Sequence, residues 1–146
     1  MTIKEVLRNK GPEVFTIGEE RTISDAIKIL VNNNIGVLLV LNSDAKISGI
    51  LSERDIVRVV HANPADFESF IIKEKMTTNV IFIEATDSIE YAQQIMTTNH
   101  IRHLPVLDNK ILIGMISIGD IVNSLLSKTQ VENKYLQDYI SGNLIG

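Results

Sequence analysis

Residues 49–57 read GILSERDIV, and residues 114–122 read GMISIGDIV. The glycine, serine, aspartate, isoleucine and valine hold the same places in both strings. Upstream, apolar positions between Val14 and Leu41 recur 66 residues later, between Val80 and Leu107. Because an internal repeat decides the architecture of a chain, we expect two similar units that pair with pseudo-twofold symmetry and form two symmetric clefts.

The composition is that of an ordinary globular protein, since 45% of the 146 residues are hydrophobic and 22% are charged. The net charge of −4 argues against a general nucleic-acid binder, which usually carries a basic face. Without cysteine there is no disulfide and no cysteine nucleophile. No apolar stretch approaches the roughly 18 residues of a membrane span, and no signal peptide is visible, so we expect a cytoplasmic protein without a membrane partner.

Each unit is expected to run β-α-β-β-α. The first unit has predicted strands over 14–17, 37–41 and 46–51, and helices that begin at Thr22 and Ser52. The second unit has predicted strands over 80–83, 103–107 and 111–116, and helices over 88–97 and 118–126. The continuous apolar run 37–41 is typical of a strand that is buried on both faces. A further short helix is predicted over 3–7, before the glycine and proline at 11–12.

These elements divide the chain into a first repeat with its N-terminal segment (1–64), a linker (65–79), a second repeat (80–127) and a C-terminal helical tail (128–146). The linker is too apolar for a flexible tether, so part of it should be helical and packed. In the tail, Val131, Tyr135 and Tyr139 fall at helical spacing beside Leu136 and Ile140. This pattern predicts an amphipathic helix that packs on its own chain or on another subunit.

The chain contains two β-α-β-β-α units, and each ends in the pattern Gly-h-h-Ser-x-x-Asp, where h is apolar. Residues 103–106 read HLPV before the second pattern. These features resemble a tandem pair of CBS domains, the Bateman module. The resemblance covers roughly residues 1–127 and implies an α/β (α+β) fold. It also implies a non-catalytic regulatory or sensory module. Such a module would bind AMP, ADP, ATP, NAD or S-adenosylmethionine between its repeats, form a disc-shaped homodimer and act on a regulated protein partner.

The candidate binding motifs are Ser52-x-x-Asp55 and Ser117-x-x-Asp120. The same spacing occurs in a helix cap, and Thr22-x-x-Asp25 is expected to be only a cap. Each candidate motif follows a buried strand that ends directly at a helix, and a helix N-terminus suits phosphate or sugar oxygens. A carboxylate can also accept both vicinal hydroxyls of a ribose. The resemblance implies that the two aspartates hold ribose while the two serines contact ribose or phosphate.

Three basic residues are candidate phosphate partners. The resemblance implies that Arg102 and His103 reach the ligand held by Asp55, and that Arg54 faces the cleft of Asp120. The competing interpretation is that they are ordinary solvated residues. Because the Asp55 cleft would receive two basic residues, we expect it to be the primary site.

The expected adenine contacts are the first strands of the units, with Thr16 and Ile17 at the first site and Phe82 and Ile83 at the second. In this family the base is recognised mostly by backbone groups and aliphatic walls, so these side chains can equally be ordinary core residues. The base itself leaves little trace in the sequence.

No enzyme motif is found, neither a phosphate-binding Gly-x-x-x-x-Gly-Lys-Ser/Thr loop nor a Gly-x-Ser-x-Gly elbow. We therefore expect no catalytic residues, no metal site and no required cofactor beyond the adenosyl ligand. Two alternatives stay open. The chain could be a structural or protein-interaction module whose clefts bind nothing, with the tail helix as its working surface, or a nucleic-acid-binding protein.

Overall fold

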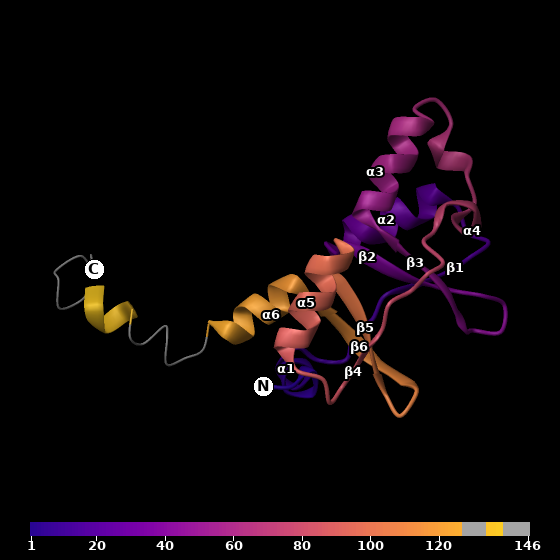
Figure 1. Cartoon of the computed structure of the whole chain (residues 1–146). Helices are drawn as coiled ribbons and strands as arrows, with labels where there is room; N and C mark the ends of the chain where they lie inside the picture. The colour runs from indigo at the N-terminus through magenta and orange to yellow at the C-terminus, as the bar shows by residue number, and fades with distance from the viewer. Residues whose placement is uncertain (127–133, 139–146) are drawn as a thin grey trace. The chain divides into compact units, whose positions relative to one another are not determined.

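The structure, a computed structural model, describes residues 1–126 and 134–138 (Figure 1). The first repeat contains β1 (Thr16–Gly18), α2 (Ile23–Asn33), β2 (Val37–Leu41), β3 (Ile47–Ser52) and α3 (Glu53–Ala62). The second repeat contains β4 (Ile83–Glu84), α5 (Ile89–Asn99), β5 (His103–Asp108), β6 (Ile111–Ser117) and α6 (Ile118–Leu125). The predicted β-α-β-β-α order and the mixed α+β fold are therefore confirmed.

Each repeat builds one three-stranded sheet with the same topology. In the first, β1 runs parallel to β2 and β2 runs antiparallel to β3, giving the order β1-β2-β3. In the second, β4, β5 and β6 repeat that order and those directions. Both sheets shift register near the end of the middle strand, at Val40/Leu41 and at Val106/Leu107. The sequence repeat therefore extends to the irregularities of the sheets.

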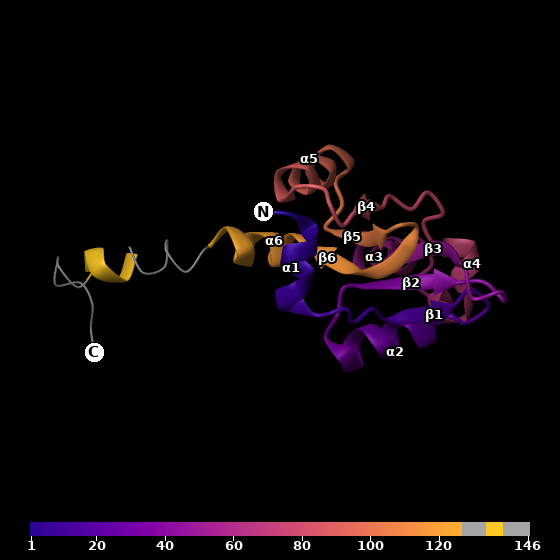
Figure 2. The same ribbon diagram turned by 90° about the horizontal axis from the view of Figure 1, so that it is seen from below.

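The described chain divides into two units that do not follow the chain order. One unit is Glu13–Ile81, and the other joins Met1–Pro12 to the chain from Phe82 onwards. The helix α1 (Ile3–Lys10) thus precedes the first repeat in sequence but belongs to the unit of the second. It contacts β6 and α6, as Figure 2 shows, and buries Ile3, Val6 and Leu7. The sequence division, in contrast, groups residues 1–12 with the first repeat.

The linker is packed, as predicted from its apolar residues. It forms the 3-10 turn η1 (Phe67–Ser69) and the short helix α4 (Ile72–Lys75), which contacts β3. Ile72 is fully buried in the core of the first unit. Beyond α4, Thr77 forms an isolated antiparallel bridge with Ile50 of β3. The linker therefore packs on the repeat that precedes it.

The core of the first unit is aliphatic, as the composition predicts. It is formed by side chains from both helices and all three strands, together with the linker: Ile17, Ile23, Ala26, Leu30, Leu38, Val40, Leu51, Val59 and Ile72. In the second unit the corresponding buried residues include Ile83, Ile89, Ala92, Leu104, Val106, Ile116 and Ile121. Both β2 and β5 are buried on their two faces, which explains their continuous apolar sequences.

Most element boundaries agree with the sequence prediction to within one to three residues, but the first strand of each repeat is shorter than predicted. The strand predicted over 80–83 is only Ile83–Glu84, because residues 80–82 do not pair with β5. In the predicted tail helix, Lys134–Asp138 is helical. Val131, Tyr139 and Ile140 lie outside the described residues. Within the described residues, no helix has the length and apolar content needed to span a membrane.

Candidate functional site

Ser52 and Asp55 form a closed hydrogen-bonded pair where β3 passes into α3. Ser52 is the N-cap, and its extended backbone (φ −105°, ψ 166°) turns the strand directly into the helix. The Ser52 N–H donates to Asp55 Oδ2 at 2.9 Å, and the Asp55 N–H donates to Ser52 Oγ at 3.3 Å. The predicted helix cap is therefore present. The Ser52 hydroxyl also lies 3.2 Å from Asp55 Oδ2 and can donate to it.

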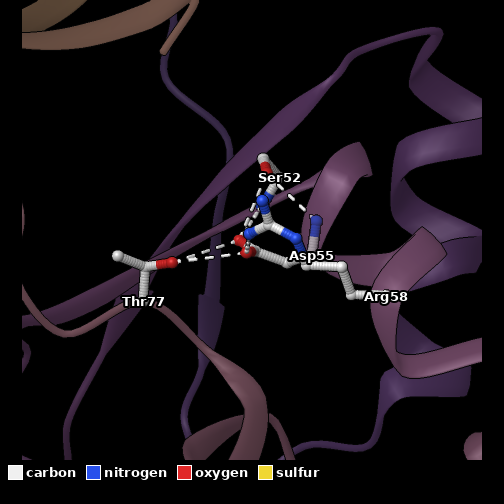
Figure 3. Close-up of polar contacts among 4 residues, drawn as sticks. All are labelled: Ser52, Asp55, Arg58 and Thr77. Atoms are coloured by element: carbon white, nitrogen blue, oxygen red, sulfur yellow. Dashed lines mark hydrogen bonds and ion pairs between the residues drawn. The ribbon is translucent and has the colours of Figure 1, made fainter. Parts of the chain in front are cut away.

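Asp55 is nevertheless more than a capping residue, because it is only 9% exposed. Figure 3 shows the Thr77 hydroxyl approaching its carboxylate, and that hydroxyl lies 3.3 Å from Oδ1 and 3.4 Å from Oδ2. Arg58 lies 3.9 Å from Oδ1, and its side chain is 70% exposed. An exposed pair at that distance contributes little stabilisation. The donors closest to this buried carboxylate are therefore neutral groups.

Asp25 provides an internal comparison, since it forms the same capping box with Thr22 at the start of α2. Its carboxylate has Arg21 Nε at 3.0 Å, and its side chain is 30% exposed. The hydrogen bond from Arg21, with one from the Thr22 backbone, lowers the pKa of Asp25. A cap of this kind thus needs neither burial nor a contact from a distant segment, and Asp55 has both.

Asp120 repeats the cap at the start of α6 but has a different distant partner. The Ser117 N–H donates to Asp120 Oδ2 at 2.8 Å, and the Asp120 N–H donates to Ser117 Oγ at 3.1 Å. Lys10 Nζ, from the last turn of α1, lies 2.7 Å from the same Oδ2. Burial alone would raise the pKa of Asp120, but the hydrogen bonds from Lys10 and Ser117 outweigh it and leave the pKa lowered.

The contacts of Thr77 and Lys10 were not predicted from the sequence, because both residues lie outside the repeated motifs. The glycine at the start of each motif could have indicated these contacts, because a glycine often marks a place where another segment of the chain packs closely. A Cβ at Gly49 would lie 2.5 Å from Met76 Sδ and 2.8 Å from the Thr77 carbonyl oxygen. A Cβ at Gly114 would lie 3.0 Å from Leu7. Each glycine therefore makes room for the segment that brings the extra partner.

The three basic candidates are placed within their own units. Arg54 is exposed in the first turn of α3. Arg102 is exposed just before β5, and its carbonyl accepts the N–H of Ile118, the first residue of α6, at 2.9 Å. His103 pairs in register with Ser117. The backbone of Arg102 and His103 thus lies beside the Ser-x-x-Asp motif of their own repeat, and their predicted approach to a ligand on Asp55 stays a prediction.

The four candidates for adenine contact differ in exposure. Ile17 and Ile83 are 4% and 1% exposed, so their side chains belong to the cores of the two units. Thr16 is exposed at the start of β1, and Phe82 is half-buried immediately before β4. Ile17 and Ile83 can therefore contribute only backbone groups to a base, whereas Thr16 and Phe82 also have accessible side-chain atoms.

A family model described as CBS domain matches residues 3–62 and 71–127. The chain belongs to the CBS-domain family. The CBS domain-containing protein CBSX3, mitochondrial, of Arabidopsis thaliana is 32% identical over 97% of this chain and 72% of the relative. The crystal structure of the CBS-domain containing protein ATU1752 from Agrobacterium tumefaciens is 34% identical and covers 84% of this chain and 91% of its own, with a TM-score of 0.81.

The CBS domain pair of protein MJ0100 is also similar, with 25% identity, a TM-score of 0.74 and coverage of 86% of this chain and 99% of its own. Its crystal structure is a complex with 5′-methylthioadenosine and S-adenosyl-L-methionine. The resemblance to a tandem CBS pair inferred from the repeated motif is thus confirmed, and a related CBS pair binds adenosyl compounds.

Proposed function

We propose that this CBS pair is a non-catalytic sensory module that binds an adenosine-containing ligand, with Asp55 as the main ribose acceptor. AMP, ADP, ATP, NAD and S-adenosylmethionine are the candidate ligands. Support for the ligand class comes from the MJ0100 pair, whose two ligands share an adenosine group.

The observation that carries the proposal is the buried Asp55 carboxylate with neutral donors. A ribose presents two adjacent hydroxyls, and a carboxylate has acceptor positions for both. Hydrogen bonds to a charged acceptor are stronger than those between neutral groups. The Thr77 hydroxyl contacts of 3.3 and 3.4 Å are long for O–H···O bonds, so ribose hydroxyls can replace them at small cost.

The N-terminus of α3 adds a second recognition element. Ser52 caps this helix directly after a strand, and the first-turn N–H groups carry partial positive charge that attracts phosphate or sugar oxygens. Arg54 in this turn, together with Arg102 and His103, supplies candidate charges for a phosphate. The adenine would be held by backbone groups near Thr16 and Ile17.

Ligand binding would act by a population shift. A ligand that binds one conformation of the module better than another increases the population of that conformation, and a protein partner reads the change. In this proposal the chain works as a homodimer in the cytoplasm and regulates a partner protein.

A thermal-shift panel with AMP, ADP, ATP, NADH, S-adenosyl-L-methionine and GTP tests the function. A ligand that binds only the folded protein raises its melting temperature by mass action. We expect a rise with at least one adenosyl compound and none with GTP. A flat panel on folded protein that is free of co-purified nucleotide would contradict the proposal and favour the protein-interaction alternative.

A further inference from the structure

The two Ser-x-x-Asp motifs are matched in sequence, but their carboxylates have different distant partners. Asp55 is approached by the neutral hydroxyl of Thr77, whereas Asp120 is held by the ammonium group of Lys10. At Asp120, the oxygen Oδ2 already accepts from both Lys10 and the Ser117 N–H, at 2.7 and 2.8 Å. The two potential ribose acceptors are therefore not equivalent.

Both the ammonium group and the backbone of Lys10 are held in place. Its ammonium group also donates to the carbonyl oxygen of Met115 in β6, at 2.6 Å. Its backbone is in the last turn of α1, where a cation is favoured by the helix dipole. The Lys10 side chain is 31% exposed and that of Asp120 is 19% exposed, so solvent screens this pair less than a surface pair.

The helix that carries Lys10 is itself anchored. Thr2 caps α1 with a complete capping box, and Ile3, Val6 and Leu7 are buried. The Ile3 N–H donates to the Asp87 carbonyl at 2.9 Å, and the Lys4 N–H donates to the Ala85 carbonyl at 2.9 Å. Gly114 lets Leu7 approach β6 closely. The ammonium group is thus held against Asp120 by packing as well as by charge.

We propose that the ion pair of Lys10 with Asp120 keeps ribose from binding at this second motif. The chain would therefore bind one adenosyl ligand, at Asp55. This inference rests on the proposed function. Ribose hydroxyls are neutral donors, so they do not compensate a carboxylate for the loss of a cation that is hydrogen-bonded to it. The loss that opposes ribose binding at Asp55 is smaller, because the Ser52 and Thr77 hydroxyls there are neutral and Arg58, whose side chain is 70% exposed, lies 3.9 Å away.

The variant K10M tests the proposal, because methionine keeps an unbranched apolar side chain on α1 and removes the charge. The matched control is K4M on the same helix. The Lys4 side chain is 57% exposed and lies 4.0 Å from Asp108, its one ion-pair partner among the described residues. Isothermal titration with AMP and with 5′-methylthioadenosine gives the number of ligands per chain. The second probe has no phosphate, so Lys10 cannot affect its binding by attracting phosphate.

We expect one ligand per chain in the wild type and in K4M, and two in K10M. The affinity of the Asp120 motif for the ligand should be at least about tenfold higher in K10M than in the wild type. The double variant K10M/D120N should return to one. A K10M protein with wild-type stoichiometry would overturn the inference while leaving adenosyl binding intact. Two ligands in the wild type, with one of them weakened by K10M, would also overturn it. Absence of binding of both probes in every protein, K10M included, would also overturn the inference, because removal of Lys10 would then open no second adenosyl site. The thermal-shift panel decides the proposed function separately.

Discussion

Asp25, Asp55 and Asp120 each occupy the third position of a helix, behind a Thr or Ser N-cap. Their local hydrogen bonds are alike, and their sequences predicted this. They differ in the further group that contacts the carboxylate. For Asp25 it is the neighbouring Arg21, whereas Asp55 and Asp120 are contacted by Thr77 and Lys10 from distant parts of the chain. At the scale of the residue, the motif alone therefore does not distinguish the three carboxylates, and their additional contacts do.

The Lys10–Asp120 pair predicts a specific acid sensitivity. Since the pKa of Asp120 is lowered in the folded protein, the unfolded chain binds more protons below about pH 4. The stabilisation of the folded protein by this pair is therefore complete above the pKa that Asp120 has in the unfolded chain. It is lost as the pH falls through the lower pKa that Asp120 has in the folded protein. In urea denaturation, the difference in unfolding free energy between wild type and K10M should shrink below about pH 4. A difference that stays constant down to pH 3 would contradict the assigned pair.

At the scale of the element, the sequence predicted what local patterns control. The caps at Thr22 and Ser52 predicted helix starts, and the apolar run 37–41 predicted a buried strand; the structure has all three. The association of α1 with β6 was not predicted, because 105 residues separate Lys10 from Met115 and no periodicity links them. The apolar face of α1 indicates that it needs a partner but does not say which one.

The two motif glycines should respond unequally to alanine. At Gly49 the added Cβ meets the Thr77 backbone oxygen at 2.8 Å, so the bridge between Ile50 and Thr77 has to shift. At Gly114 the nearest atoms belong to the end of the Leu7 side chain, at 3.0 Å, which can adjust. We expect G49A to lower the free energy of unfolding by about 1–3 kcal/mol and G114A by less. Urea denaturation of both variants measures this, and an equal or reversed order would contradict the proposed role of Gly49.

At the scale of the whole molecule, the proposed homodimer needs an apolar surface. Val57 on α3 and Val122 on α6 occupy the same position of the two repeats, and they are 65% and 45% exposed. Burial of such side chains against a second copy would favour association. We therefore expect these helices to take part in the dimer interface.

Substitution of Val57 by glutamate should weaken the dimer, because a charge would have to be buried at the interface. The matched control is V31E, since Val31 on α2 is 70% exposed and lies outside the expected interface. Light scattering coupled to size-exclusion chromatography should show dissociation of V57E at concentrations where V31E stays dimeric. Identical masses for the two variants would exclude Val57 from the interface.

The role of Asp55 as ribose acceptor is tested most directly by isothermal titration of D55A and D25A with the adenosyl compound that raises the melting temperature. Both variants lose the same capping box, so their difference isolates the binding role. We predict that D55A binds about 10- to 150-fold more weakly, equivalent to about 1.5–3 kcal/mol for hydrogen bonds to a charged acceptor, while D25A binds like the wild type. An unchanged dissociation constant in folded D55A would contradict the account.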